Sequence, residues 1–384
     1  MADVIWERVR EAAGMEDGKF SWQGRHTPGP FGHLGDPGLR ASVLECASPS
    51  AFAARQSAAT ARRRLALFFA HLQPHISIFH PPSFILYSLP VQFRKITVIG
   101  VGLLGGSIGL AVKRRKLARQ TAGFVRRAAS VAECRKLGAV DLATRDLRRA
   151  VEDADLVVLC TPLAQMRSRV RETIPFLRRG AIVTDVGSVK GSVVRELEPL
   201  VAKAGAHFVG SHPMAGAEKT GVAAACADLF KNAVCVVTPT RKTNRAALKK
   251  VEQFWKSLGS RVLELTPETH DTLVGRSSHL PHVVAATMAG HVLNPARPKH
   301  QAAVCANGFR DTTRIASGSP EMWRDIALAN RRNLGRSLDA FMADLKKIRR
   351  VLAKGDAKTI ARFFETAKQR RDDWCACCAS PSPE

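Results

Sequence analysis

Short apolar runs alternate with longer stretches of helical spacing from about residue 93 to residue 266. The runs are rich in β-branched residues, which is typical of strands buried on both faces of a sheet. Strands that alternate with helices predict an α/β fold, a Rossmann-type doubly wound parallel sheet. The predicted strands are residues 96–99, 121–125, 155–161, 181–185, 207–211 and 233–238, and the clearest predicted helices are residues 131–137 and 191–204.

Strand patterns disappear after about Pro267, and apolar residues then recur at helical spacing as far as Trp374. The pattern predicts one long helix over residues 323–353. We therefore expect an all-α domain over residues 267–374, after a dinucleotide-binding domain over residues 93–266 and before a disordered tail at residues 375–384. Helices this long and apolar usually need a partner, so we expect the helical domain to form a homodimer.

Residues 1–92 differ from the rest and are rich in Pro, Gly, Ala, Ser and Arg. The uncharged run from Leu65 to Phe93 is interrupted by histidines and prolines, so it predicts no membrane-spanning helix. It lies too far from the N-terminus for a signal peptide. We expect a poorly ordered basic extension and no contact with a membrane.

The nine cysteines form no disulfide-like ladder, which indicates a reducing compartment, and we expect the cytoplasm. Cys375, Cys377 and Cys378 lie together in the tail, but no fourth ligand is near them, and we expect no metal site. The formal net charge of +26 is compatible with nucleic acid, a membrane surface or an anionic small substrate. Because the arginines are spread over the helices without a nucleic-acid-reading motif, we expect a basic surface that attracts small anionic ligands.

A glycine-rich turn follows the first predicted strand. Gly100, Gly102 and Gly105 have the G-x-G-x-x-G spacing, and an apolar helix begins directly after them. Gly100 permits a tight turn, Gly102 leaves room for a pyrophosphate, and Gly105 lets the helix pack closely on the strand. Free N–H groups at the start of the helix, around Leu103 and Leu104, suit phosphate oxygens. An ordinary βα turn is the alternative, but the strand–turn–helix context favours dinucleotide binding.

The end of the second predicted strand bears on the choice of cofactor. An NAD site has an acid there, which binds the ribose 2′-hydroxyl. Val125 occupies this position, and Arg126 and Arg127 follow it. A guanidinium suits a phosphate dianion, so we predict NADP, with NAD as the alternative. Thr161 and Pro162 end another strand, at the edge where such sheets bind ligands, and we include them among the cofactor contacts.

Four polar clusters follow the glycine-rich unit, and each has a structural alternative when taken alone. His212 is compatible with a turn cap, His279 and His282 with core packing, and Arg314 with a surface cation. Asp185–Lys190 and Gly210–Glu218 each follow a strand, Ser278–His282 begins a helix, and Gly308–Ala316 precedes Trp323.

Together these strings identify a resemblance. The chain from about Arg94 to Trp374 resembles the prephenate/arogenate dehydrogenases of tyrosine biosynthesis, through Gly-Ser-Val-Lys (187–190), Ser-His-Pro-Met-Ala-Gly-Ala-Glu (211–218), Ser-His-Leu-Pro-His (278–282) and Phe-Arg-Asp-Thr-Thr-Arg-Ile-Ala (309–316). The resemblance implies that a hydride leaves C4 of prephenate for a nicotinamide while the ring carboxylate leaves as CO2. Aromatisation to 4-hydroxyphenylpyruvate drives this step.

The resemblance also implies residue roles. His212 corresponds to the histidine that accepts the 4-hydroxyl proton, and a neutral imidazole suits that role. Ser188 corresponds to the serine that bonds the same hydroxyl and orients the nicotinamide, and Arg314 to the arginine that binds a carboxylate of the dianionic substrate. The remaining matches are Ser278 and His282 lining the site, Glu218 and Asp311 in a gating ion network, and Trp323 as an aromatic wall; the roles of Lys190 and His279 stay open.

Four alternatives differ in substrate or in class of protein. Plant arogenate enzymes carry an acid shortly after the Ser-His-Pro-Met string, whereas residues 219–222 read Lys-Thr-Gly-Val, which favours prephenate over arogenate. A β-hydroxyacid dehydrogenase shares the plan but leaves the histidine strings unexplained. A non-catalytic NADP-binding sensor would not need these polar residues. A short-chain dehydrogenase is excluded because Tyr87, the only tyrosine, lies outside the expected domains.

Overall fold

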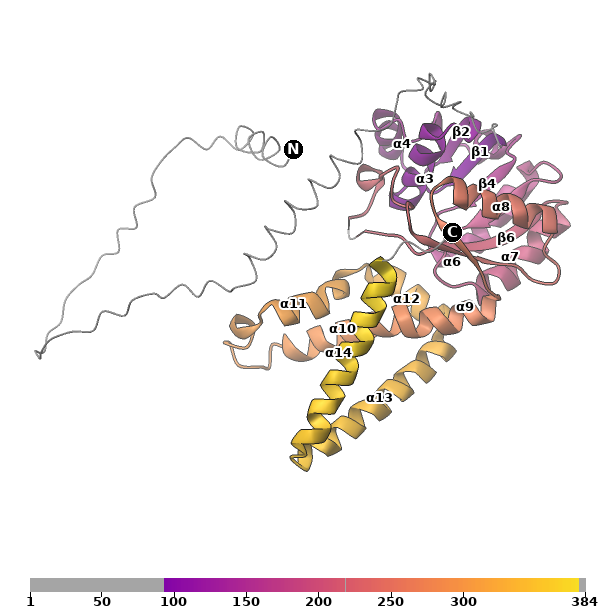
Figure 1. Ribbon diagram of the computed structural model, residues 1–384. Helices are drawn as coiled ribbons and strands as arrows, with labels where there is room; N and C mark the ends of the chain where they lie inside the picture. Colours follow the sequence, from indigo (N-terminus) through magenta and orange to yellow (C-terminus); the bar gives the residue numbers. More distant parts are fainter. Residues whose placement is uncertain (1–92, 218, 380–384) are drawn as a thin grey trace, which may run out of the picture. The chain divides into compact units, whose positions relative to one another are not determined.

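In the computed structural model, the described residues are 93–217 and 219–379 (Figure 1). The predicted extension over residues 1–92 lies outside them. In the described part, eight strands form one sheet in the order β3-β2-β1-β4-β5-β6-β7-β8. The strands are β1 Phe93–Ile99, β2 Ala118–Phe124, β3 Leu142–Thr144, β4 Leu156–Leu159, β5 Ile182–Asp185, β6 His207–Pro213, β7 Val234–Thr238 and β8 Arg261–Glu264.

The predicted strands are present, but one pairing is not parallel. β7 runs antiparallel to β6, while the other neighbouring strands pair in parallel. The sheet is therefore mostly parallel, as expected, and departs from the parallel arrangement only at the β6–β7 pair. Between β6 and β7 the described residues contain only the short 3₁₀ turn η3 (Val222–Ala224), and a parallel connection needs a longer crossover, usually a helix. β3 and β8 were not predicted, because β3 is very short and β8 is largely exposed.

Helices cover both faces of this sheet, as the two-sided burial of the strands requires. Leu156 and Val158 of β4 pack in the core with α3 and α8, whereas Val157 and Leu159 pack on the other face with α6 and α7. These alternating side chains confirm that the central strands are buried on both faces. The helices are α3 Leu103–Arg114, α4 Ala128–Lys136, α5 Leu147–Val151, α6 Leu163–Thr173, α7 Gly191–Lys203 and α8 Arg245–Ser257.

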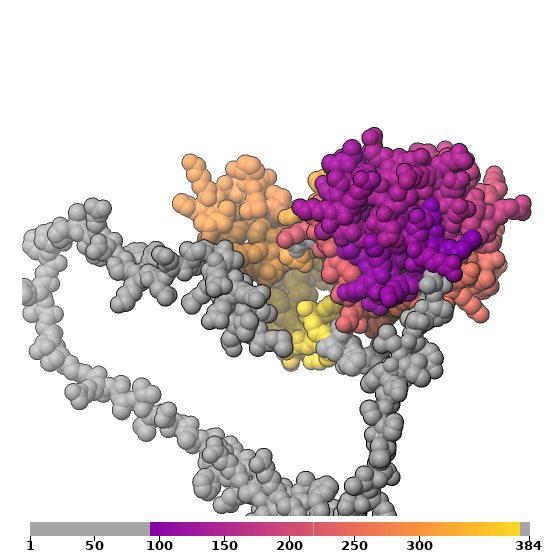
Figure 2. All heavy atoms as spheres, turned by 90° about the horizontal axis from the view of Figure 1, so that it is seen from above, coloured from indigo at the N-terminus to yellow at the C-terminus, as the bar shows by residue number. Residues whose placement is uncertain are grey.

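From Pro267 to Ala379 the regular elements of the chain are all helical, as predicted. The elements are α9 Pro267–Val274, the π-helical turn η4 Gly275–His279, α10 Leu280–Val292, the 3₁₀ turns η5 Ala302–Val304 and η6 Arg314–Ser317, α11 Asn307–Thr313, α12 Pro320–Ala329, α13 Arg331–Ala353 and α14 Ala357–Ala379. Figure 2 shows the residues of the sheet and its helices in indigo, magenta and salmon, and the later helices in orange and yellow.

Two helical boundaries differ from the expectation. The predicted helix over residues 323–353 is two helices, because Asn330 leaves helical geometry (φ −110°, ψ 24°) and its buried amide bonds to other elements. α14 continues past Cys375, into the segment expected to be a tail. α13 and α14 are joined by a short turn (Figure 1) and expose large apolar side chains. The most exposed are Leu345, Leu352, Phe364 and Trp374.

None of the described helices is long and apolar enough to cross a membrane. The same residues contain no cluster of histidine, cysteine and acidic side chains that could hold a metal ion.

Candidate active site

The glycine-rich turn links β1 to α3 as its spacing predicts. Gly100 has a φ of +96°, and a Cβ there would lie 2.7 Å from the carbonyl oxygen of Cys160. A Cβ on Gly105 would overlap the carbonyl oxygen of Gly100, so the third glycine permits close packing of helix on turn. By contrast, no described atom lies within 4 Å of a Cβ built on Gly102. The second glycine therefore borders open space.

The residues around this turn fit a dinucleotide. α3 begins at Leu103, and among the described residues no side chain caps its first turn, so N–H groups there are free for phosphate oxygens. Leu103 and Leu104 are partly exposed at this end. Thr161, just after β4, has a buried Oγ1 without a hydrogen-bond partner in the described part, next to the exposed Pro162. An orphaned hydroxyl beside an open helix N-terminus is what a bound cofactor would satisfy.

The end of β2 presents arginines and no acid. Phe124, its last residue, pairs with Ile99 of β1, and the buried Val125 donates its N–H to the carbonyl of Thr144. Arg126 and Arg127 follow as exposed side chains. Val125 thus stands where an NAD site has a carboxylate, and two guanidinium groups follow it directly.

A fully buried ion pair fixes the loop after β5 against β6. The ammonium group of Lys190 contacts the carboxylate of Asp185 and donates to the carbonyl oxygen of Ser211 at 2.8 Å. The Ser211 N–H in turn donates to Asp185 at 3.1 Å. Burial lowers the pKa of Lys190, while the Asp185 carboxylate opposes that shift. The role of Lys190, left open by the sequence, is thus to join the Ser188 loop to the strand that carries His212.

His212 lies at the end of β6 with a neutral imidazole. Burial holds its pKa well below the ordinary value, and the neighbouring His270, Lys190 and His279 lower it further. Its Nδ1 lies 2.9 Å from Nε2 of His270, and the two rings meet edge to face. A neutral imidazole is an acceptor for a proton, which suits a general base.

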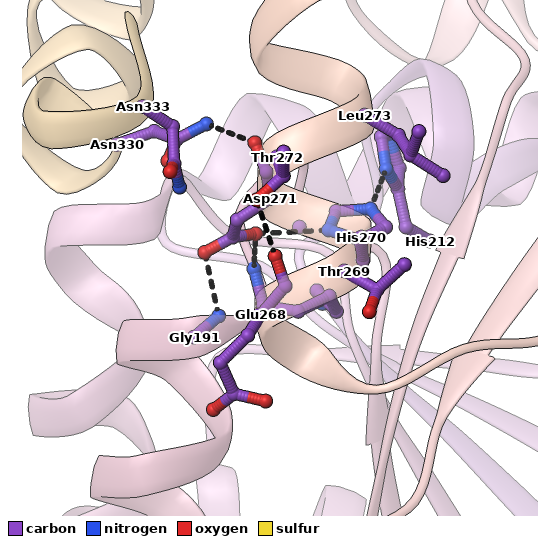
Figure 3. Close-up of polar contacts among 12 residues, drawn as sticks. Gly191, His212, Glu268, Thr269, His270, Asp271, Thr272, Leu273, Asn330 and Asn333 are labelled. Atoms are coloured by element: carbon purple, nitrogen blue, oxygen red, sulfur yellow. Dashed lines mark hydrogen bonds and ion pairs between the residues drawn. The ribbon is translucent and has the colours of Figure 1, made fainter. Parts of the chain in front are cut away.

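His270 and Asp271 complete a chain of contacts that the sequence did not reveal (Figure 3). Both belong to α9, and Nδ1 of His270 lies 2.9 Å from Oδ1 of Asp271. The Asp271 carboxylate also accepts the backbone N–H groups of Lys190 and Gly191, at 2.7 and 2.8 Å, where α7 begins. The available signal was a His-Asp pair in the first helix after the last strand, which no motif distinguished.

A second group of aromatic side chains comes from the helical part. His282 of α10 stacks on Trp323 of α12, with ring centroids 3.5 Å apart, and its Nδ1 donates to the carbonyl of Ser278 at 3.0 Å. His279 is buried beside them, and burial lowers its pKa to about 4. Nδ1 of His279 lies 3.1 Å from the amide nitrogen of Asn330, whereas its buried Nε2 has no hydrogen-bond partner among the described residues.

The predicted site residues are brought together to different degrees. The Ser188 backbone lies beside His279 and raises its pKa against the larger effect of burial, so the serine loop meets the histidine group. Arg314, exposed on η6, is close enough to His282 for its charge to lower the pKa of that imidazole. Asp311 is exposed on α11. Glu218 lies outside the described residues.

Two family descriptions match consecutive parts of the chain. "Prephenate dehydrogenase, nucleotide-binding domain" matches residues 108–264, and "Prephenate dehydrogenase, dimerization domain" matches residues 266–366. Among curated relatives, a prephenate dehydrogenase of Bacillus subtilis is 36% identical over 72% of this chain and 75% of its own length. A cyclohexadienyl dehydrogenase of Zymomonas mobilis is 34% identical over 73% of this chain and 95% of its own length.

Solved structures agree with these relatives. A prephenate dehydrogenase of Aquifex aeolicus, crystallised with hydroxyphenyl propionate and NAD+, superimposes with a TM-score of 0.69 at 31% identity, over 73% of this chain and 98% of that one. A Synechocystis arogenate dehydrogenase gives a TM-score of 0.64 at 30% identity, over 73% and 99% of the two chains. The resemblance and fold class predicted from the motifs are confirmed. The chain belongs to the prephenate dehydrogenase family of NAD(P)-dependent oxidoreductases.

Proposed function

We propose that the chain is a prephenate dehydrogenase, which converts prephenate to 4-hydroxyphenylpyruvate and CO2. The observation that carries the proposal is His212, an imidazole that burial keeps neutral at the end of β6, beside the loop that holds Ser188. The names of the relatives support the substrate. When bound, the nicotinamide cofactor accepts the hydride that leaves C4 of the substrate.

The chain's own residues would then handle a proton and two carboxylates. His212 takes the proton of the 4-hydroxyl group as the carbonyl forms, and Ser188 hydrogen-bonds the same oxygen. The ring carboxylate leaves as CO2, and its bonding electron pair enters the ring, which becomes an aromatic phenolate. The phenolate oxygen then takes the proton back from His212, which gives the phenol of the product and restores the neutral imidazole. Arg314 holds a carboxylate of the dianionic substrate by paired hydrogen bonds.

The remaining predicted residues would shape the site. Ser278, His282 and Trp323 line it from the helical part, which is supported by the stacking of His282 on Trp323. We further propose that Glu218 and Asp311 belong to an ion network at the entrance.

We propose NADP as the preferred cofactor, with Gly100, Gly102 and Gly105 at its pyrophosphate. Two exposed arginines follow β2 where an NAD site has an acid, which supports the preference. NAD is the alternative, and the Aquifex aeolicus relative was crystallised with NAD+.

The experiment is a reduced-cofactor absorbance assay that crosses prephenate and arogenate with NADP and NAD. Turnover of prephenate with a higher kcat/KM for NADP is expected. A preference for arogenate, which the Synechocystis relative's name raises, would change the substrate and keep the chemistry. Cofactor binding without turnover of either substrate would favour the non-catalytic sensor.

The role of His212 is tested by His212→Asn. We expect cofactor affinity to be kept and kcat to fall by about 10²–10⁴-fold, the range for loss of a general base. His207→Asn, the same change at the other end of β6, is the matched control and should leave kcat within about twofold. Near-normal turnover of the His212 variant would exclude it as the base.

A further inference from the structure

We propose that His270 and Asp271 are positioning residues that fix the proton of neutral His212 on Nδ1 and so leave Nε2 bare as the base. The inference rests on the proposed role of His212 and extends it to two residues that no motif identified. Its basis is the unbroken chain of contacts from the start of α7, through α9, to the end of β6 (Figure 3).

The chain begins at a carboxylate that can only accept. Oδ1 and Oδ2 of Asp271 receive the N–H groups of Lys190 and Gly191, and a backbone N–H has no other role than donor. The third partner of this carboxylate is Nδ1 of His270, 2.9 Å from Oδ1. His270 must therefore carry a proton on Nδ1.

The next step follows from the neutrality of His270. The ring is fully buried, and burial lowers its pKa despite the nearby carboxylate. A neutral imidazole has one N–H only, so with Nδ1 protonated the Nε2 of His270 is an acceptor. Nε2 of His270 lies 2.9 Å from Nδ1 of His212, and this hydrogen bond exists only if His212 donates it. His212 then has its single proton on Nδ1.

The chemical consequence is that only one ring nitrogen of His212 can accept the substrate's proton. His212 can take a proton only at Nε2, the nitrogen not engaged by α9. As that proton arrives, the new positive charge is delocalised over a ring that already donates to His270 and, through it, points toward the Asp271 carboxylate. An acid placed behind a histidine in this way stabilises the imidazolium and holds one tautomer.

Asp271 itself is held from a third side. The side-chain amide nitrogen of Asn330 donates to the backbone carbonyl of Asp271 at 2.8 Å, and its oxygen accepts from Asn333 at 2.8 Å. The amide orientation is thus set by its partners, and its second N–H faces Nδ1 of His279. His279 must then hold its proton on Nε2, opposite to His212, so the two imidazoles have different tautomers.

The test reads the tautomer directly, in full-length protein with 15N-labelled histidine. The ring-nitrogen resonances distinguish a protonated from an unprotonated nitrogen, and His212→Asn assigns the His212 pair by its disappearance. We expect a protonated Nδ1 and an unprotonated Nε2 in the wild type. A wild-type His212 protonated on Nε2 would overturn the proposal.

Asp271→Asn replaces the carboxylate that accepts from His270 by an amide that can donate to it. The direction of the hydrogen bonds between residue 271, His270 and His212 can then reverse. We expect a mixed or inverted tautomer of His212 and a loss of kcat of about 10²-fold or more, as for the buried acid behind a catalytic histidine. Glu268→Gln, an exposed acid-to-amide change on the same helix, is the matched control and should change neither quantity. An unchanged His212 spectrum in Asp271→Asn would contradict the proposal that Asp271 sets the His212 tautomer through His270.

A pair of variants at His270 separates this role from packing. Gln can offer its amide oxygen near the place of Nε2, whereas Leu fills the space without an acceptor. We expect His270→Gln to keep kcat within about tenfold and His270→Leu to lose about 10²-fold, at equal cofactor affinity. Equal kcat in the two variants would contradict the proposal that His270 acts by accepting a hydrogen bond from His212. Because the spectra need no substrate, failure of the proposed reaction would leave the tautomer result readable.

Discussion

His212 owes its neutral state to its surroundings rather than to its sequence neighbours. It is faced by His270 of α9, by Lys190 before α7, by His279 of η4, and by Cys235 of β7, whose thiol interacts with the His212 backbone. Burial and the positive charge of Lys190 both oppose a second proton on the ring. The base is therefore ready over a wider acidic range than a free histidine.

This environment predicts the pH dependence of turnover. A general base works while unprotonated, so activity is kept until the pH falls through its pKa, which here lies well below 6.5. We expect kcat to remain near its plateau at pH 6, where an exposed histidine would already be largely protonated. A pH profile of kcat from about 5 to 8 checks this, and an acidic limb centred near 6.5 or above would contradict it.

At this scale the sequence named His212, His282 and Arg314 as candidates because each belongs to a distinctive string, and it named Trp323 shortly after the last one; the stacking of His282 on Trp323 is visible only in the structure. It did not predict His270 or Asp271. Their contacts span 58 residues to His212 and 81 residues to Lys190, so only the folded sheet and helices bring them together. A histidine followed by an acid is too common in helices to mark a site.

At the scale of elements, two glycines in the turn from β1 to α3 have different roles: Gly105 permits close packing, and Gly102 leaves room for the cofactor. Gly105→Ala places a methyl group against the Gly100 carbonyl and should lower the free energy of unfolding by about 1–3 kcal/mol. Gly102→Ala meets no described atom, so it should cost less stability and instead raise the cofactor Kd about tenfold or more. Thermal unfolding and cofactor titration of both variants check this, and an equal Kd for Gly102→Ala and wild type would contradict it.

The arginines after β2 lead to a prediction about the preference between NADP and NAD. Arg126→Asp replaces a cation suited to a 2′-phosphate by an acid suited to a 2′-hydroxyl. We expect kcat/KM with NADP to fall by about 10–100-fold while that with NAD holds or rises. Arg119→Asp, at the other end of the same strand, is the control. A parallel loss with both cofactors would show that Arg126 does not discriminate.

The sequence pattern predicted the central strands well, since they are short and largely apolar and their side chains are buried on both faces of the sheet. The pattern did not predict the direction of a strand, which depends on the length of the segment that joins it to its neighbour, nor a helix break that depends on side-chain contacts. The antiparallel β7 follows from the lack of a described crossover helix after β6, and the break at Asn330 follows from amide contacts with Asp271 and His279. Neither signal is visible in the apolar pattern.

At the scale of the whole molecule, the exposed apolar side chains of the helical part indicate that the chain self-associates. Phe364 is 63% exposed and lies within the residues matched by the dimerization domain, and Trp374, further along the same helix α14, is 61% exposed. We propose a homodimer through this part. Sedimentation should give twice the chain mass of 41.7 kDa.

Phe364→Glu should shift this equilibrium toward monomer, because a charge would have to be buried in the interface. Lys136→Glu on α4, a charge change in the other domain, is the control and should leave the dimer intact. A monomeric wild type at micromolar concentration would exclude the interface.

Asp271 also links catalysis to heat resistance. Its carboxylate accepts the first N–H groups of α7, and its carbonyl holds the junction of α12 and α13, while its contact with His270 orients the base. Any opening that separates α9 from α7 therefore uncaps a helix and misdirects His212 in one event. Thermal inactivation should accordingly begin at the same temperature as the loss of amide protection at the start of α7, below the temperature at which the sheet unfolds.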